Sequence, residues 1–334
     1  MAPISRREAL TSLALAPLAG HVASRAAAAR SLVAQPPAAA PAASGAGRQH
    51  PIGLVSRHVQ WTSMDDAVAV AKEAGFDEIE WNVRAGGHIE PARVAQDLPK
   101  AVDLTKKAGL AVRMVTTSIQ DANSPNVQAI LETMSGLGIR CYRGGQYFRF
   151  DYAKPLWPQL EALKPRMAGL AALNAKYGTQ VAYHTHSAPG NIGGNIWDFW
   201  EVVKGFDPTQ VGLNYDIGHA VARGGVGWID GALISATHIV ALAIKDTRWA
   251  KGPRGWRAEF VPVGEGMVDL PRLAGVLDQA KFTGPVNIHY EHNGMLGDDV
   301  GKWTIPTTRE RYLELLKADL AAVRAGLRAA APGA

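Results

Sequence analysis

Short apolar runs alternate along this chain with longer segments whose apolar residues recur every three or four positions. Runs of five to eight residues rich in Val, Ile and Leu are typical of buried strands, and the longer segments are typical of amphipathic helices. Glycine often follows the helical pattern, as a helix C-cap requires. The predicted strands are 51–55, 76–83, 110–117, 139–143, 179–185, 211–216, 239–245 and 285–291. The predicted helices are 65–74, 91–108, 126–137, 156–177, 196–204, 228–237, 270–281 and 308–327.

Eight strand-helix units in one chain predict a single closed (β/α)₈ TIM barrel over residues 51–327. Closure is favoured over an open sheet because a closed barrel leaves no strand edge exposed. About 285 residues follow position 50, which is a usual size for one such barrel. The repetition lies in the architecture, because no internal sequence repeat is evident.

The two ends of the chain have compositions that do not fit the barrel. Arg6 and Arg7 precede a moderately apolar stretch and then an Ala-rich one, so residues 1–30 are predicted to be a twin-arginine signal peptide. An ordinary secretory signal with two basic residues is the alternative. Residues 31–50, rich in Ala and Pro, are predicted to be a disordered linker, and 328–334 a disordered tail. We therefore expect contact with the export machinery and a periplasmic location.

Charge and cysteine content limit the possible partners. The formal charge is +5, but residues 1–30 hold four arginines and one glutamate, which leaves +2 for the rest. This near-neutral body argues against nucleic acid as a partner. No other stretch approaches a membrane span, so no membrane partner is expected. Cys141 is the only cysteine, so no intrachain disulfide can form. An oligomer is compatible with the sequence.

Polar residues gather at the predicted strand ends on alternate positions. The chemistry of such barrels lies at the carboxyl ends of the strands. On five strands the polar residues share one face and the apolar residues the other. The polar residues that we expect to converge there are Glu80, His184, His186, Asp216, His219, Lys245, His289 and Glu291.

Asp216 ends an apolar strand and has two interpretations. It could cap the following turn, with Gly218 supplying a positive φ. Alternatively, a buried carboxylate beside imidazoles could bind a metal, since burying an unpaired carboxylate is costly. One buried histidine is more often a core residue than a ligand, but four histidines with three carboxylates favour a divalent ion such as Mn²⁺, Zn²⁺, Mg²⁺ or Co²⁺.

Six short motifs together resemble the xylose-isomerase-like sugar phosphate isomerase/epimerase superfamily, which includes the AP endonuclease 2 fold relatives. The resemblance covers nearly all of residues 51–325, and the order and spacing of the motifs carry it. The motifs are Gly75-Phe-Asp-Glu-Ile-Glu80, Tyr183-His-Thr-His186, Asp216-Ile-Gly-His219, Ile244-Lys-Asp246, Val263-Gly-Glu-Gly266 and His289-Tyr-Glu291.

The resemblance implies a metal held by Glu, Asp, His and Glu after strands five to eight, with the two Glu residues moving the proton. Asp216 and Glu291 match this pattern, whereas His184 replaces the first Glu and Ala243 replaces the His. The implied ligands are therefore His184, Asp216 and Glu291, with His219, or else His186 or His289, as a fourth. Alternatively, Lys245 supplies a fixed positive charge and the metal is lost.

The expected activity is a metal-dependent sugar isomerase or epimerase that removes a proton beside a sugar carbonyl. The base is predicted to be Glu291 or His184, with Lys245 donating to an oxygen. The predicted substrate contacts, to a small sugar or glycoside, are Glu80, His186, His219, His289, Arg57 and Trp249. Stacking of an indole on the sugar ring by Trp249, Trp61, Trp81 or Trp303 competes with simple packing of these residues.

Three other functions compete with this one. A lyase or dehydratase acting on 3-keto-glycosides or inososes would share the first step, and export favours such unphosphorylated substrates. An endonuclease is disfavoured by the charge. The third is a non-catalytic periplasmic sugar-binding barrel with a decayed site. Its best evidence is Ala243, which cannot bind a metal.

Overall fold

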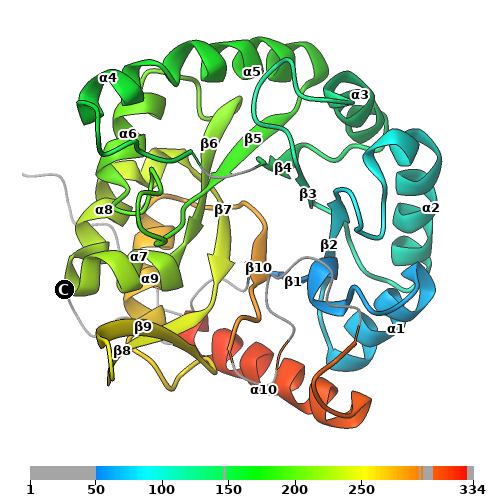
Figure 1. Ribbon diagram of the computed structural model, residues 1–334. Coiled ribbons are helices and arrows are strands. Elements are labelled where there is room, and N and C mark those ends of the chain that lie inside the picture. The colour runs from blue at the N-terminus through cyan, green and yellow to red at the C-terminus, as the bar shows by residue number, and fades with distance from the viewer. Residues whose placement is uncertain (1–49, 146–147, 293–294, 296–303, 329–334) are drawn as a thin grey trace, which may run out of the picture. The chain divides into compact units, whose positions relative to one another are not determined.

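Eight parallel strands close into a barrel in this computed structural model, which describes residues 50–145, 148–292, 295 and 304–328 (Figure 1). Around the barrel the strands follow the order β1-β10-β7-β6-β5-β4-β3-β2, and each pairs in parallel with its neighbours. The predicted single (β/α)₈ barrel is therefore confirmed. The barrel strands are β1 (Ile52–Val55), β2 (Glu78–Val83), β3 (Met114–Thr117), β4 (Cys141–Arg143), β5 (Gln180–His184), β6 (Val211–Asp216), β7 (Ile239–Ile244) and β10 (Val286–Ile288).

Helices surround the barrel and cover the apolar outer face of its strands (Figure 1). Their apolar stripes and the outward strand residues, such as Leu54, Trp81 and Tyr215, form one buried core. The α-helices are α1 (Met64–Ala74), α2 (Val94–Lys107), α3 (Val127–Gly136), α4 (Leu156–Glu161), α5 (Lys164–Tyr177), α6 (Trp197–Val203), α7 (Ile217–Gly224), α8 (Trp228–Ser235), α9 (Leu270–Gln279) and α10 (Arg309–Arg328). The 3₁₀ turns are η1 (Ser56–Val59), η2 (Pro91–Arg93), η3 (Gly225–Gly227) and η4 (Ala236–His238).

The inner face of the barrel combines small and polar side chains. Met114, Cys141, Ala182 and Ala241 form a small apolar layer apart from the main core. Gly53 leaves room for Asn287, because a Cβ atom at position 53 would lie 2.0 Å from the Asn287 Oδ1 atom. The small residues make space for polar groups nearer the carboxyl ends of the strands.

Side-chain caps and a C-terminal glycine define several helix boundaries. The Ser63 hydroxyl accepts a hydrogen bond from the Asp66 N–H, and Gly75 ends α1 with φ of 91°. At α9 the Asp269 carboxylate accepts from the Arg272 N–H in the same way. The strands at 110–117 and 285–291 are shorter than predicted.

Two predicted helical regions differ from the structure. The predicted helix 156–177 is two helices, α4 and α5, because Pro165 cannot donate a backbone hydrogen bond to the preceding turn. α7 was not predicted, since Gly218 was interpreted as a turn residue. Gly218 does not have a positive φ; it lies inside α7, where a Cβ atom would be 2.5 Å from the Lys245 Cγ atom. A close approach therefore explains this glycine.

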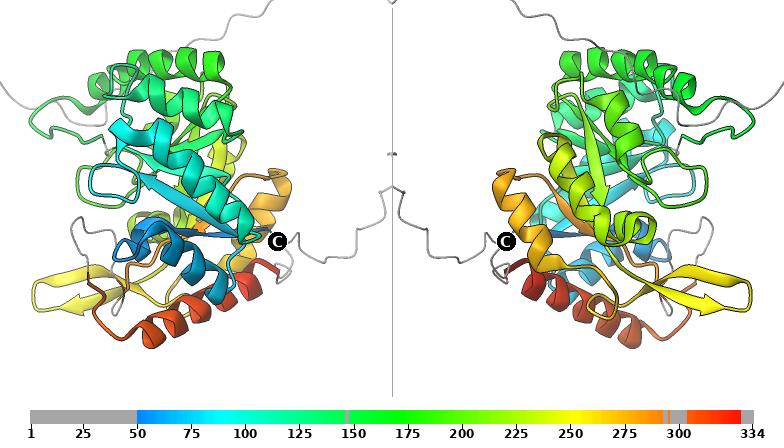
Figure 2. Two further views of the ribbon diagram at one scale, coloured as in Figure 1. Left: turned by 90° about the vertical axis from the view of Figure 1, so that its right-hand side faces the viewer. Right: turned by 90° about the vertical axis from the view of Figure 1, so that its left-hand side faces the viewer.

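A β-hairpin between β7 and α9 was missed at the sequence level. Strands β8 (Asp246–Gly252) and β9 (Gly255–Val261) pair antiparallel and extend from the carboxyl end of the barrel (Figure 2). The foot of the hairpin is held by the buried Asp246 carboxylate. It accepts hydrogen bonds of 2.7 to 3.0 Å from the N–H groups of Thr247, Gly264, Gly266 and Val268.

The predicted signal peptide at 1–30 and linker at 31–50 lie outside the described residues, apart from His50, as does the tail beyond Arg328. Export and a periplasmic location therefore remain predictions. Among the helices that the structure describes, none combines the length and apolarity that crossing a membrane needs.

We predict that Asp246→Ala lowers the free energy of unfolding by about 3 kcal/mol, because four backbone N–H groups lose a charged acceptor at a buried position. Urea denaturation followed by circular dichroism measures this loss. Asp269→Ala is the matched control, since it removes a single capping bond and should cost about 1 kcal/mol. Equal losses in the two variants would contradict the clamp assigned to Asp246.

Candidate functional site

Three buried side chains at the carboxyl ends of β5, β6 and β10 form a compact group. His184, Asp216 and His289 each offer one donor atom, and these atoms lie within 4.8 Å of one another. His184 and Asp216 are the last residues of their strands, and His289 follows β10 directly. Two imidazoles and one carboxylate are a donor set that divalent transition metals accept.

Asp216 holds its position through backbone and side-chain contacts. Its N–H donates to the Thr185 hydroxyl at 2.9 Å, and its Oδ1 atom accepts from the His219 N–H at 2.9 Å, which caps α7. The Oδ2 atom lies 3.5 Å from His184 Nε2 and 3.2 Å from Lys245 Nζ. The two interpretations of Asp216 are therefore compatible, since one oxygen caps the helix and the other faces the cluster.

The two histidines of the group suit a cation. Both ring nitrogens of His289 are buried without a hydrogen-bond partner among the described residues, and the ring stacks on His184 at 5.0 Å between centroids. A buried donor atom without a partner is costly, and a bound cation would remove that cost. Burial, followed by the charge of Arg143, lowers the pKa of His184 well below its usual value. Its imidazole is therefore neutral near pH 7, which is the form that binds metals. The residues fit a divalent metal.

Lys245 places a buried ammonium group beside this cluster. Its Nζ atom lies 2.5 Å from Glu291 Oε1, 2.7 Å from His219 Nε2 and 3.2 Å from Asp216 Oδ2. Glu291 and His219 accept hydrogen bonds from this ammonium, whereas Asp216 contacts it as an ion pair. Burial raises the pKa of Asp216, and the Lys245 charge opposes that rise.

The structure gathers most of the predicted site residues. Glu291 and His219, expected to bind metal, both contact Lys245, and His289, one of the alternatives for a fourth ligand, lies with His184 and Asp216. His289 Nδ1 is also 3.9 Å from Glu291 Oε1, so the metal-ligand set stays a prediction. His219 accepts from Lys245 through Nε2, so its Nδ1 can donate to the Ser187 hydroxyl at 2.9 Å.

His186 lies at the edge of the cluster. Its ring centroid is 3.8 Å from that of His219, and its Nδ1 atom accepts from the Ala188 N–H at 3.1 Å. The side chain is partly exposed, so it borders the opening of the site.

Three predicted contacts lie further out. Glu80 is buried inside the barrel and accepts hydrogen bonds from Thr116 and Asn287. Arg57 is buried in η1, beside His58, whose ring centroid is 5.6 Å from that of His289.

Trp249 lies outside the cluster on β8, where it is 43% exposed. Of the other tryptophans considered for stacking, Trp81 is buried and donates to Thr105, and Trp61 packs against Tyr312. Trp303 lies outside the described residues.

Two residues of the site were missed at the sequence level. Arg143 is buried at the end of β4, and its charge contributes to the low pKa of His184. Its alternation with Cys141 on the inner face was the signal that could have identified it. Phe260 of β9 lies with its ring centroid 4.7 Å from Lys245 Nζ and 5.3 Å from the centroid of His219. No sequence signal identified it, because the hairpin itself was not predicted.

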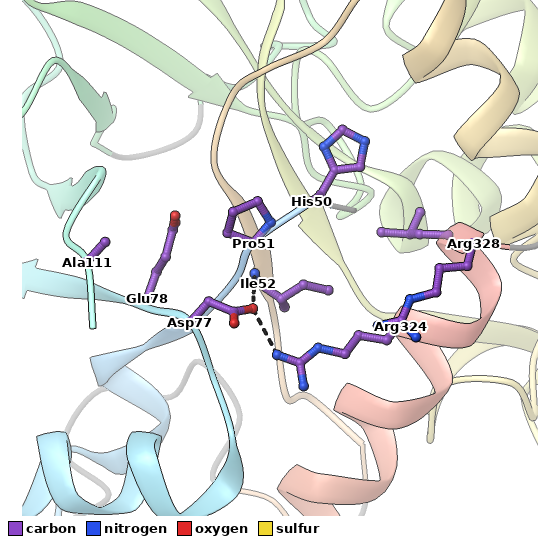
Figure 3. Close-up of a pocket in the computed structure, with 9 residues that line it drawn as sticks. His50, Pro51, Ile52, Asp77, Glu78, Ala111, Arg324 and Arg328 are labelled. Atoms are coloured by element: carbon purple, nitrogen blue, oxygen red, sulfur yellow. Dashed lines mark hydrogen bonds and ion pairs between the residues drawn. The ribbon is translucent and has the colours of Figure 1, made fainter. Parts of the chain in front are cut away.

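A hollow of about 400 Å³ lies at the amino end of the barrel, opposite the histidine cluster. His50, Glu78 and Arg328 contribute to its wall, and Asp77 forms an ion pair with Arg324 at 2.8 Å across it (Figure 3). Glu78 is also paired, with Arg113, and the barrel interior separates the hollow from the histidine cluster. We assign no chemistry to it.

Comparison with known proteins agrees with the fold. A family model described as xylose isomerase-like TIM barrel matches residues 68–317. A search of curated proteins finds no match.

Several solved structures are similar. A D-psicose 3-epimerase from Clostridium cellulolyticum H10, solved with D-tagatose, has a TM-score of 0.60 at 15% identity, covering 84% of this chain and 100% of that one. The 3-keto-D-glucoside 4-epimerase from E. coli gives 0.59 at 15% identity, covering 83% and 100%. A xylose isomerase-like TIM barrel protein from Mycobacterium smegmatis in complex with magnesium gives 0.57 at 16% identity, covering 82% and 98%.

We predict that Lys245→Met lowers the free energy of unfolding at pH 7 by at least about 3 kcal/mol, because it leaves Asp216 and Glu291 without their cation. Removing Lys245 also raises the pKa of Asp216 further. The folded state then binds a proton that the unfolded state does not, so the loss grows as the pH rises and shrinks as it falls.

Chemical denaturation of metal-free protein between pH 5 and pH 8 measures the effect. Lys204→Met is the matched control, because Lys204 pairs with Glu201 on an exposed helix and should contribute little. A loss that is the same at every pH would contradict the pairing of Lys245 with Asp216.

Proposed function

The chain belongs to the xylose isomerase-like TIM barrel family, and we propose that it is a metal-dependent sugar epimerase or isomerase. The observation that carries the proposal is the contact of two buried groups. The His184, Asp216 and His289 donors lie beside the Lys245 and Glu291 pair, with Lys245 Nζ contacting both carboxylates. One group suits a cation and the other suits proton transfer.

Glu291 is the side chain best placed to take the proton. Its side chain is 12% exposed, whereas those of Lys245, Asp216 and His184 are 2% exposed or less. Among these four groups, a sugar entering the site therefore reaches Glu291 first. A carboxylate held at 2.5 Å by an ammonium has a fixed orientation, which a general base needs.

Lys245 then responds to the transferred proton. When Glu291 accepts a proton it loses its negative charge and holds the ammonium less strongly. One Lys245 N–H is then available to the oxygen on which negative charge develops. If a second group on the other face of the carbon supplies the new proton, the product is an epimer. If Glu291 returns its proton to the neighbouring carbon, the product is an isomer.

His184, Asp216 and His289 would hold the divalent metal, which would supply Lewis-acid polarisation of the sugar carbonyl when bound. Asp216 would take part with its Oδ2 atom, because its Oδ1 atom caps α7. The neutral state of His184 leaves a lone pair for this role.

Free keto sugars and keto-glycosides are the proposed substrates. The similar structures are named for a D-psicose 3-epimerase and a 3-keto-D-glucoside 4-epimerase, and neither name includes a phosphate. The lyase alternative shares the first step and differs only in the fate of the enediolate, so the product separates the two.

We expect the protein to epimerise or isomerise at least one sugar from a panel of D-fructose, D-allulose, D-tagatose and 3-keto-D-glucosides. In D₂O the product should carry deuterium at the carbon that loses its proton, as NMR detects. Glu291→Gln should lower kcat by at least about 100-fold, since it removes the base. Glu265→Gln, on an exposed loop, should leave turnover unchanged. An unsaturated product would replace the epimerase by the lyase.

We also expect the purified protein to bind about one equivalent of Mn²⁺, with His289→Ala weakening binding at least about tenfold. Isothermal titration of chelator-treated protein measures this directly. His238→Ala is the matched control, because His238 is also buried but contacts the Phe206 carbonyl. Binding that survives His289→Ala unchanged would place the cation elsewhere.

A further inference from the structure

One face of the β8–β9 hairpin carries an exposed row of aromatic side chains. In the antiparallel register, Thr247 pairs with Phe260, Trp249 with Ala258 and Lys251 with Trp256. Paired residues of antiparallel strands point to the same face, so Phe260, Trp249 and Trp256 share one side. Trp249 is 43% exposed and Trp256 is 66% exposed.

The opposite face is charged and paired within itself. Arg248 lies opposite Glu259, and Arg257 contacts the same carboxylate at 2.7 Å. This face has the ordinary character of a solvated strand surface. The aromatic residues are therefore segregated to one side of the hairpin.

That side is continuous with the candidate active site. Phe260 is nearest the foot of the hairpin and lies against Lys245 and His219. Trp249 follows and Trp256 is nearest the tip in the strand register. The row therefore leads outward from the site along the hairpin, whose backbone projects from the barrel in Figure 2. Positions on one face of a strand repeat about every 6.7 Å, which is comparable to the width of a sugar ring.

We propose that Trp249 and Trp256 form a subsite for the second ring of a glycoside whose first ring occupies the catalytic cluster. The inference rests on the proposed function, which it narrows from sugars in general to two-ring glycosides. The C–H face of a pyranose is apolar and stacks on an indole, whereas its edge carries hydroxyls. Lys251, exposed on the same face, supplies a donor for those hydroxyls.

The continuity with the cluster favours a glycoside over a protein partner. A protein partner could bind the exposed indoles of Trp249 and Trp256. It would not contact Phe260, because Phe260 lies inside the site against Lys245. A second ring joined to the reacting sugar would extend past Phe260 and lie against Trp249 and Trp256.

The test compares one-ring with two-ring sugars by isothermal titration calorimetry on the complete protein with Mn²⁺ present. The probes are maltose, cellobiose, trehalose and sucrose, with D-glucose and D-fructose as the one-ring controls. We expect at least one disaccharide to bind more tightly than both monosaccharides. Trp256→Ala should weaken that disaccharide about tenfold and leave monosaccharide binding unchanged. Trp256→Tyr should retain most of the affinity.

Trp157→Ala is the matched control. Trp157 is 56% exposed on α4, a helix separate from the hairpin (Figure 1), and its loss should change neither affinity. Sedimentation of wild type and Trp256→Ala tests the protein-partner reading. A dimer that Trp256→Ala dissociates would overturn the subsite.

Three further results would overturn the subsite: no disaccharide binding more tightly than the monosaccharides, Trp256→Ala weakening both classes alike, and Trp256→Ala changing neither. Because the readout is binding, it is independent of turnover. Disaccharide binding that depends on Trp256, in a protein that epimerises no sugar, would keep the subsite and remove the epimerase. Turnover of monosaccharides, together with disaccharide binding that Trp256→Ala does not change, would keep the epimerase and remove the subsite.

Discussion

The site depends on one buried ammonium held between two carboxylates and an imidazole. Asp216 and Glu291 come from strands on either side of β7, so their negative charges converge at the barrel mouth. Without a cation between them, two carboxylates at such a depth would not both stay ionised. Lys245 supplies that charge from the position directly after β7, and its ammonium donates hydrogen bonds to Glu291 and His219. The remaining features of the site can be understood as ways of keeping this cation in place.

Space for the lysine comes from glycine and alanine. Gly218 lets α7 begin against the Lys245 stem, and Ala243 leaves the inner face of β7 open below it. The resemblance placed a metal-binding histidine at position 243, and its loss suggested a decayed site. His289 lies beside His184 and Asp216 instead, so an imidazole is present at the cluster from a different strand.

The barrel and the polar inner face followed from the sequence because both depend on periodicity. Alternation along strands such as β5 and β6 predicts which residues point inward, and closure brings their ends together. The contacts within the site did not follow. The hydrogen bond between Glu291 and Lys245 depends on the rotamers of two long side chains, which no sequence spacing encodes. The hairpin was missed because its charged and aromatic residues alternate without the apolar run that marks a buried strand.

The caps at Ser63 and Asp269 are simple, because one side chain serves one helix. The role of Asp216 was harder to predict, because its two oxygens have different partners and either role alone would explain the residue. A sequence pattern states which residue type stands at a position but not how its atoms are shared.

Lys245 and Asp246 are neighbours in the chain, yet one belongs to the chemistry and the other fixes the foot of the arm. The boundary between the catalytic centre and the β8–β9 arm therefore falls between these two residues. Apart from Phe260, which contacts the lysine, the arm beyond residue 247 can change its length and side chains while the lysine stays where it is. New ligand preferences can therefore arise in this lineage without rebuilding the centre that performs the reaction.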